Sequence, residues 1–141
     1  QTTLAVEHWD RSLPIYEGSR YTYQQLELYV PDTDQKIAGL LTALENSDYI
    51  IVATNRLTDS IPNVPGRYPK TIKYYDLLFS NQLGFSQVAE FTSYPTLFGY
   101  EINDQSADES FTVYDHPRVR IFQKTNFDSE TVREKLNEGL K

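Results

Sequence analysis

The feature that most constrains the fold is Tyr49–Ala53, a continuous apolar run (YIIVA) between polar turn signals. Such runs are typical of strands that are buried on both faces, as in parallel sheets. A helical apolar stripe precedes the run, and Asp32 or Thr33 is placed to cap that helix. The stripe consists of Ile37, Leu40, Leu41 and Leu44. A helix that leads into a buried strand predicts part of a βαβ unit.

Further strand and helix patterns continue this alternation along the chain. We expect strands at Thr2–Val6, Tyr23–Val30 and Phe85–Phe91, and a helix from about Pro69 to Leu83. Pro69 suits a first helical turn, and Gly84 suits a C-terminal cap. The pattern predicts an α/β fold with a three-layer, mostly parallel Rossmann-like sheet and helices on both faces. With 141 residues and no internal linker, the chain is expected to form one domain, residues 1–141.

The C-terminal part follows a different pattern. Phe111–Asp115 and Val119–Gln123 flank a His-Pro-Arg turn and are expected to form a β-hairpin. Because Val119 and Ile121 alternate with Arg120, we expect them to share the buried face, and Phe122 breaks this alternation. A final helix is expected after Asp128, with apolar residues at Val132, Leu136 and Leu140.

Composition and missing motifs exclude several classes of function. The chain has no cysteine, so disulfides, thiolate metal sites and cysteine nucleophiles are excluded. Its net charge of −7 repels phosphate backbones, so nucleic-acid binding is not expected. Glycine-rich phosphate loops, the G-x-S-x-G elbow and H-E-x-x-H are absent. Asp104, Asp108 and Glu109 lack the spacing of a calcium loop. We therefore predict no cofactor, no metal and no catalytic residue.

Polar and aromatic residues follow the expected strands, where doubly wound sheets bind their ligands. The candidate ligand-binding residues are His8, Trp9, Asp10, Asp32, Asn55, Arg56 and Tyr94. The His8–Asp10 triplet can bind a sugar, with the indole on its apolar face, or the indole can close the edge of the sheet. Asn55 and Arg56 can clamp a phosphate or carboxylate, or Arg56 can pair with a nearby acid and order the following proline-rich loop.

Several stretches of the sequence are similar to sequences of a known family of membrane proteins. They are Val6–Pro14 (VEHWDRSLP), Leu26–Thr33 (LELYVPDT), Ser47–Leu57 (SDYIIVATNRL), Ser60–Phe79 (SIPNVPGRYPKTIKYYDLLF), Leu83–Phe85 (LGF), Glu90–Asp104 (EFTSYPTLFGYEIND) and Glu109–Lys124 (ESFTVYDHPRVRIFQK). Together they resemble the C-terminal soluble region of the "YYY" polytopic membrane proteins, which are related to family 39 glycosyltransferases that use lipid-linked sugars. The resemblance spans nearly the whole chain.

The resemblance implies an extracytoplasmic accessory domain whose partner is the transmembrane portion of the same polypeptide. The catalytic acid of such enzymes would lie outside this chain, and the domain would help to bind a glycan, a lipid-linked sugar or an acceptor. The chain begins with Gln1 and has no methionine, and we expect it to be part of a larger protein. The alternative is a structural or interaction module that binds no ligand of its own. That alternative predicts an exposed apolar patch, for which Asn55–Pro69 and Tyr74-Tyr75 are candidates.

Overall fold

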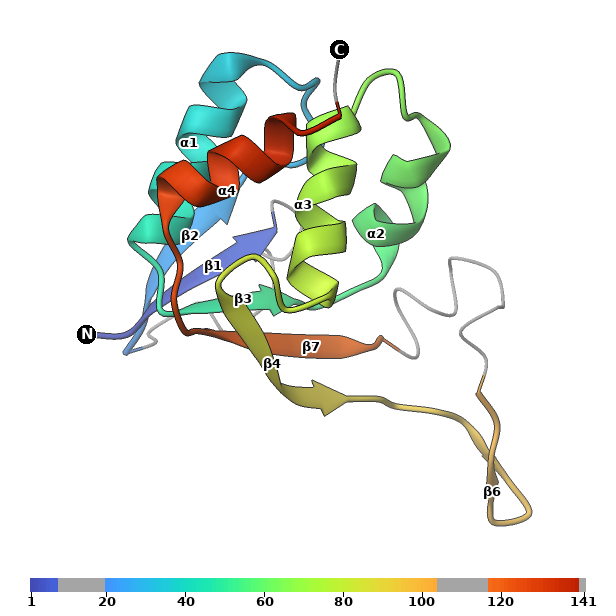
Figure 1. The fold of residues 1–141 in the computed structure, drawn as a ribbon. Helices are drawn as coiled ribbons and strands as arrows, with labels where there is room; N and C mark the ends of the chain where they lie inside the picture. The colour runs from blue at the N-terminus through green and yellow to red at the C-terminus, as the bar shows by residue number, and fades with distance from the viewer. Residues whose placement is uncertain (8–19, 104–116, 140–141) are drawn as a thin grey trace.

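The fold is α/β, built around a five-stranded sheet with the strand order β2-β1-β3-β7-β4 (Figure 1). The computed structural model describes residues 1–7, 20–103 and 117–139. The strands are β1 (Thr3–Glu7), β2 (Thr22–Leu26), β3 (Tyr49–Val52), β4 (Phe85–Phe91), β5 (Thr96–Leu97), β6 (Tyr100–Glu101) and β7 (Val119–Lys124). The helices are α1 (Asp34–Glu45), α2 (Arg56–Ser60), the 3₁₀ helix η3 (Ile61–Asn63), α3 (Pro69–Phe79) and α4 (Ser129–Asn137). In the described part of the chain, no helix is long and apolar enough to span a bilayer.

The sheet is mixed, which corrects the expectation of a mostly parallel sheet. β1 pairs with β2 and β3 in parallel, whereas β7 pairs with β3 and β4 in antiparallel fashion. Because β7 lies between β3 and β4, both of its edges are occupied by these two strands. The expected hairpin of Val119–Gln123 with Phe111–Asp115 therefore does not describe the pairing of β7, and Phe111–Asp115 lies outside the described residues.

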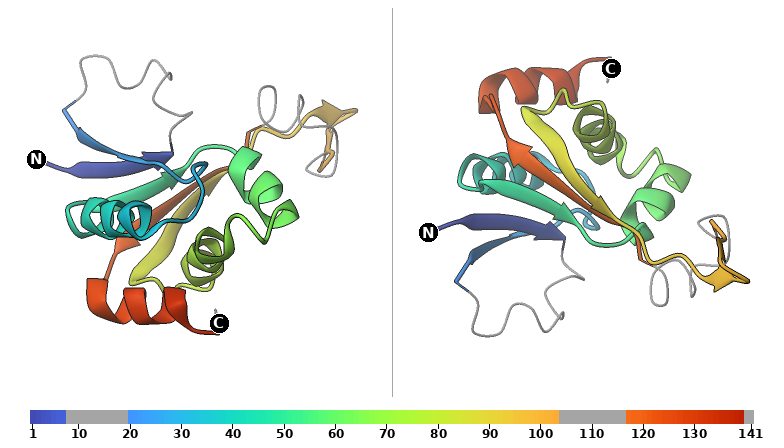
Figure 2. Two further views of the ribbon diagram at one scale, coloured as in Figure 1. Left: turned by 90° about the horizontal axis from the view of Figure 1, so that it is seen from above. Right: turned by 90° about the horizontal axis from the view of Figure 1, so that it is seen from below.

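The described helices cover one face of the sheet, so the layers seen are two and not three (Figure 2). α4 packs against both α1 and α3, and it thereby closes the helical layer. The consequence is visible in β3, where Ile50 and Val52 are buried under the helices but Tyr49 and Ile51 on the other face are only half-buried. The continuous apolar run predicted burial on both faces, and this is wrong for the second face.

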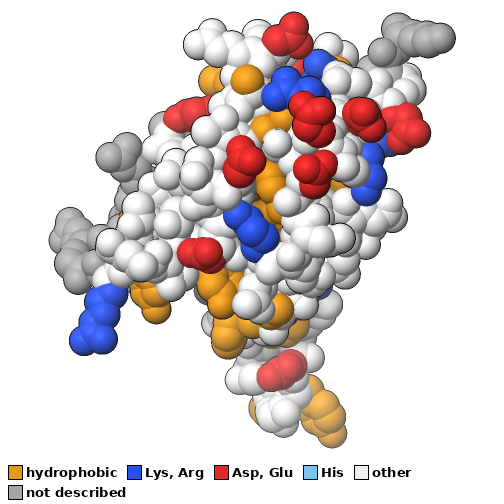
Figure 3. Space-filling model, turned by 60° about the vertical axis from the view of Figure 1, so that its left-hand side comes forward, with side chains coloured by type: hydrophobic (Ala, Val, Ile, Leu, Met, Phe, Trp, Pro, Cys, Tyr) orange, Lys and Arg blue, Asp and Glu red, His pale blue; other side chains and the backbone are white. Residues whose placement is uncertain are grey.

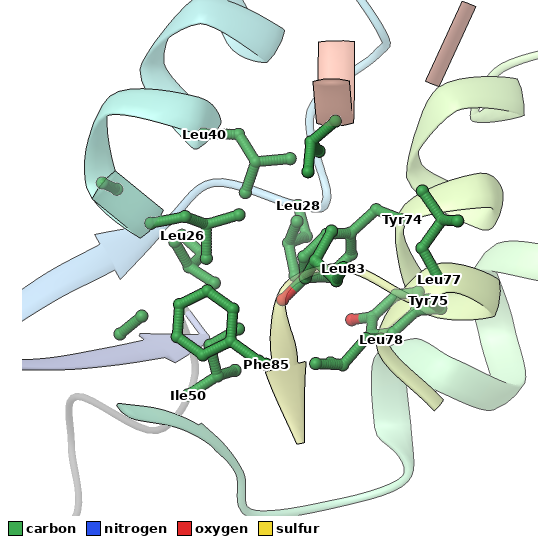
Figure 4. Close-up of a cluster of buried hydrophobic side chains, with 14 of the residues drawn as sticks. Leu26, Leu28, Leu40, Ile50, Tyr74, Tyr75, Leu77, Leu78, Leu83 and Phe85 are labelled. Atoms are coloured by element: carbon green, nitrogen blue, oxygen red, sulfur yellow. The ribbon is translucent and has the colours of Figure 1, made fainter. Parts of the chain in front are cut away.

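The core lies between the sheet and the helices, where Ile50 and Phe85 of the strands face Leu40 of α1 and Tyr74 and Leu78 of α3 (Figure 4). The predicted stripe of α1 and the residues Val132 and Leu136 of α4 belong to this core. Leu140 lies outside the described residues.

The side-chain direction of β7 is opposite to the prediction. Phe122 is fully buried in the core beneath the helices, while Val119 and Ile121 are half-buried on the other face. Arg120 shares the helical side with Phe122 because side chains alternate along a strand. Phe122 indicates the buried face of β7 better than Val119 does, because a large aromatic side chain gains more free energy from burial than a valine.

Helix α3 ends earlier than predicted, at Phe79. Asn81 takes a left-handed conformation (φ 58°), and the N–H groups of Asn81 and Gln82 donate to the carbonyls of Leu78 and Leu77. This is the Schellman arrangement that ends many helices. Gly84 therefore does not cap the helix, and its positive φ of 89° belongs to the turn into β4.

Candidate functional site

A buried ion pair joins the loop after β2 to the start of α3. Lys36 Nζ donates to Asp32 Oδ1 at 2.8 Å, and both side chains are almost completely buried. The same ammonium donates to the carbonyls of Leu28 and Val30 at 2.9 and 2.8 Å, and to Thr71 Oγ1 at 2.5 Å. One lysine thus fixes the path of the loop and holds it against α3.

The Asp32 carboxylate also caps α3 from a distant part of the chain. The backbone N–H groups of Lys70 and Thr71 donate to Oδ2 at 2.6 and 3.0 Å, and Thr71 Oγ1 donates to Oδ1 at 2.6 Å. Burial raises the pKa of Asp32, but the hydrogen bonds from Lys36 and Thr71 outweigh it and lower the pKa below its ordinary value. Burial lowers the pKa of Lys36, and Asp32 opposes this shift. The structure gives Asp32 a structural role, and its contact with a ligand stays a prediction.

A second polar group lies at the carboxyl end of β1. Glu7 is the last residue of β1, and the Tyr75 hydroxyl of α3 donates to its Oε1 at 2.6 Å. Both side chains are buried. Burial raises the pKa of the neighbouring Tyr74 well above its ordinary value, and the negative charge of Glu7 adds to that shift.

Arg120 of β7 brings a cation to the same edge of the sheet. It lies opposite Val52 of β3 and Glu90 of β4 in the strand register. Its Nη2 donates to Asn55 Oδ1 at 3.3 Å, and its guanidinium lies 4.1 Å from the centre of the Phe79 ring. Within the described part of the chain, its buried Nε has no hydrogen-bond partner. We call Glu7, Asn55, Tyr75 and Arg120 the carboxyl-edge cluster.

One cation and three acidic residues act on the charge of Arg120. Burial and the nearby Arg118 lower the pKa of Arg120, while Glu90, Glu7 and Asp59 act in the opposite direction. Arg118 binds Glu90 through two hydrogen bonds of 3.0 Å, in the fork-to-fork arrangement that suits arginine and carboxylate. Within the cluster, Glu7 offsets the charge of Arg120, so the cluster does not resemble a dedicated anion site.

The predicted site residues are distributed over the molecule. His8, Trp9 and Asp10 lie outside the described residues, as do the acidic residues Asp104, Asp108 and Glu109. Asp32 belongs to the ion pair with Lys36, whereas Asn55 belongs to the carboxyl-edge cluster and Arg56 begins α2. Tyr94 is half-buried between β4 and β5.

The sequence patterns missed Lys36, Thr71, Glu7 and Arg120. Lysine and glutamate are normally exposed, so neither Lys36 nor Glu7 is expected in a core. One usable signal existed for Glu7, because it lies two residues after Ala5 and therefore on the same face of β1. The partners of Lys36 and Arg120 come from other elements, and a single sequence does not reveal such contacts.

A hairpin projects from the sheet away from the helices (Figure 1). β5 and β6 are joined by the two-residue turn Phe98-Gly99, in which both residues have positive φ angles of 52° and 84°. Two positive values identify a type I′ turn, which favours Asn or Gly and not an aromatic residue. A left-handed conformation costs a residue with a side chain about 1–2 kcal/mol. Phe98 holds this strained position at the tip with 93% of its surface exposed.

Other exposed apolar side chains surround Phe98 on this projection. Leu97 is 55% exposed and Tyr100 is 79% exposed, and Phe91 and Ile102 extend the apolar surface toward the sheet. Hydrophobic side chains are also visible on the projecting segment in the space-filling view, and on the lower part of the body beside it (Figure 3). We call residues 91–102 the hairpin arm. The two tyrosines expected in such a patch, Tyr74 and Tyr75, are buried instead.

The described part of the chain contains no group of three or more His, Cys, Asp or Glu residues that could bind a metal ion. The chain matches no protein-family model, no curated protein sequence and no solved structure.

Proposed function

We propose that this chain is a non-catalytic accessory domain that docks through its hairpin arm. Following the family resemblance, the partner is the transmembrane portion of the same polypeptide, a protein related to lipid-linked-sugar glycosyltransferases. The domain would then lie on the extracytoplasmic side of the membrane. The observation that carries the proposal is the exposed, strained Phe98 at the tip of a projecting hairpin.

Two unfavourable free-energy contributions at the tip of the hairpin arm favour a docking role. An exposed apolar patch forfeits the free energy that burial would gain, about 25 cal/mol for each Å² of apolar surface. The left-handed conformation of Phe98 adds strain, and strained residues concentrate where a contact requires them. Aromatic residues that enter a pocket of the partner commonly dominate binding. Both costs are recovered if Phe98 enters an apolar pocket of the partner.

The carboxyl-edge cluster supports a second candidate, the binding of a glycan or acceptor. Its glutamate, amide, hydroxyl and guanidinium groups are of the kinds that bind sugar hydroxyls, and they meet where parallel strands end. Glu7 directly precedes the predicted His8–Asp10 site. Three of the four cluster residues, Glu7, Asn55 and Tyr75, are buried, however, and the hydrogen bonds within the cluster also explain their presence as packing.

The substitution Phe98→Asn separates docking from stability. Asparagine tolerates the left-handed conformation, so we expect the isolated domain to keep its fold and to gain up to about 1 kcal/mol of stability. Loss of the aromatic anchor is expected to weaken docking by more than tenfold, as about 2 kcal/mol is typical of such anchors. Biolayer interferometry can measure binding of the domain to the separately expressed transmembrane portion in nanodiscs.

Val64→Asn is the matched control, because Val64 is also an exposed apolar residue (47%) but lies in the loop between η3 and α3. It is expected to bind like the wild type. Equal affinities for Phe98→Asn and the wild type would contradict docking through the arm. In that case, glycan-induced NMR shifts at Asn55 and Arg56 would instead favour the second candidate.

A further inference from the structure

The sheet face that the described helices leave uncovered is apolar across three strands. Side chains alternate along a strand and register partners share a side, so the pairing of β3, β7 and β4 assigns the residues of this face. We call them the open sheet face: Tyr49, Ile51, Ser86, Ala89, Phe91, Val119, Ile121 and Gln123. None of them is charged, whereas a sheet face that lies in water is usually polar. The open sheet face therefore has the composition of a buried surface.

The chain itself covers the open sheet face incompletely. Ile51 and Ile121, which are register partners at its centre, are half-buried, and Phe91 at its end is 59% exposed. On the neighbouring strand β1, Leu4 and Val6 of the same face are buried. The uncovered surface therefore begins at β3 and extends over β7 to the edge strand β4.

The open sheet face continues into the hairpin arm. Phe91 belongs to both, as the last residue of β4 and the first residue of the arm. The arm leaves the sheet on the side away from the helices (Figure 1), and hydrophobic side chains lie on the body beside it (Figure 3). Within the arm, Leu97 and Tyr100 form a cross-strand pair and share one face of the hairpin. Apolar side chains therefore extend from β3 to the tip at Phe98, so that one partner can contact both surfaces.

The size of the hairpin arm indicates that stable docking needs more surface than the arm alone. A stable protein interface takes about 20–30 residues on each side, and the arm spans residues 91–102. The open sheet face supplies further apolar residues and brings no charge into the interface. A second copy of the chain is a poorer partner for it, because each copy has a net charge of −7 and two copies repel one another.

We propose that the partner that receives the hairpin arm also lies across the open sheet face, and that the surface it presents there is flat, apolar and uncharged. This inference rests on the proposed docking function and extends its interface from the arm to β3, β7 and β4. The partner then supplies the second covering layer that the apolar run Tyr49–Ala53 predicts and that the described helices do not provide.

A charge placed on the open sheet face tests the inference in the nanodisc assay. Ala89 is half-buried and lies opposite Ile121, and Ala89→Lys adds an ammonium group there without removing an apolar contact. We expect this variant to keep its fold and to bind the transmembrane portion more than tenfold more weakly. Gln87→Lys is the matched control, because Gln87 is an exposed residue of the same strand that lies opposite Phe122, on the helical side. It is expected to bind like the wild type.

Ile121→Thr is a second variant that introduces no charge. Threonine keeps the β-branched shape that suits a strand, so the sheet is expected to persist while binding weakens at least threefold. If Phe98→Asn weakens binding but Ala89→Lys and Ile121→Thr bind like the wild type, the open sheet face is not part of the interface and docking through the arm stands. If Ala89→Lys weakens binding and Phe98→Asn does not, the open sheet face is retained and the arm is contradicted.

Two further measurements distinguish the other possible occupants of the open sheet face. Equal binding of the wild type to empty nanodiscs would assign the surface to lipid. Dimers that light scattering detects for the wild type but not for Ala89→Lys would assign it to a second copy. Either result would overturn the inference.

Discussion

At the scale of single residues, Asp32 and Asp34 are close in sequence but differ in what their loss would remove. Asp32 neutralises the buried Lys36, whereas Asp34 is fully exposed and makes a 3.4 Å surface pair with Lys70. Asp32→Asn leaves a buried ammonium without its counter-charge and is expected to cost about 3–5 kcal/mol of stability. Asp34→Asn is expected to cost less than about 1 kcal/mol. Urea unfolding monitored by circular dichroism measures both, and equal midpoints would contradict the assigned role of Asp32.

The same residue shows where prediction from sequence stops. The sequence places Asp32 after a strand and predicts that Asp32 or Thr33 caps α1, and in the structure the cap is Thr33. The residues that Asp32 caps, Lys70 and Thr71, are 38 and 39 positions further along the chain. A local pattern indicates that a carboxylate can cap a helix, but it does not indicate which helix.

At the scale of elements, the turn between α3 and β4 depends on Gly84. Alanine there would have to keep a positive φ of 89° and would place its Cβ 2.4 Å from the Phe127 backbone. Backbone strain of about 1–2 kcal/mol and overpacking of about 1–3 kcal/mol lead us to expect a loss of about 2–5 kcal/mol for Gly84→Ala. Gly99→Ala has a similar φ of 84° but open space, so only the strain is expected. Thermal and urea unfolding would contradict this reasoning if the two variants lost equal stability.

The order of the strands in the sheet was harder to predict than which residues form strands and helices. The strands around Thr3–Glu7, Tyr49–Val52 and Phe85–Phe91 and the helices around α1 and α4 agree with predictions from local sequence patterns. The insertion of β7 between β3 and β4 is a non-local pairing, and the sequence of β7 does not indicate which strands it pairs with. Short elements such as α2 and the β5–β6 hairpin carry too few residues for a period to emerge.

At the scale of the whole molecule, carboxylates with lowered pKa values join separate elements or cap a helix. The hydrogen bond from Arg118 lowers the pKa of Glu90 and joins β4 to the start of β7. The hydrogen bond from Thr131 lowers the pKa of Asp128, which caps α4. Asp32 behaves in the same way between the β2–α1 loop and α3. All three carboxyls therefore bind protons more weakly in the folded chain than in the unfolded one.

The sign of this difference predicts how stability responds to acid. A group whose folded pKa is depressed contributes stability above its unfolded pKa and loses it as the pH falls through the folded pKa. The ordinary values of 4.5 for Glu90 and 3.8 for the two aspartates therefore place the loss below about pH 4.5. Urea unfolding between pH 7 and pH 3 is expected to show a falling free energy of unfolding in that window.

The double substitution Glu90→Gln and Asp128→Asn should lower stability at pH 7 and make the fall of the free energy of unfolding with decreasing pH shallower, because two of the three linked protons are removed. Since both proteins share every other carboxyl group, parallel slopes would show that these contacts do not set the acid response.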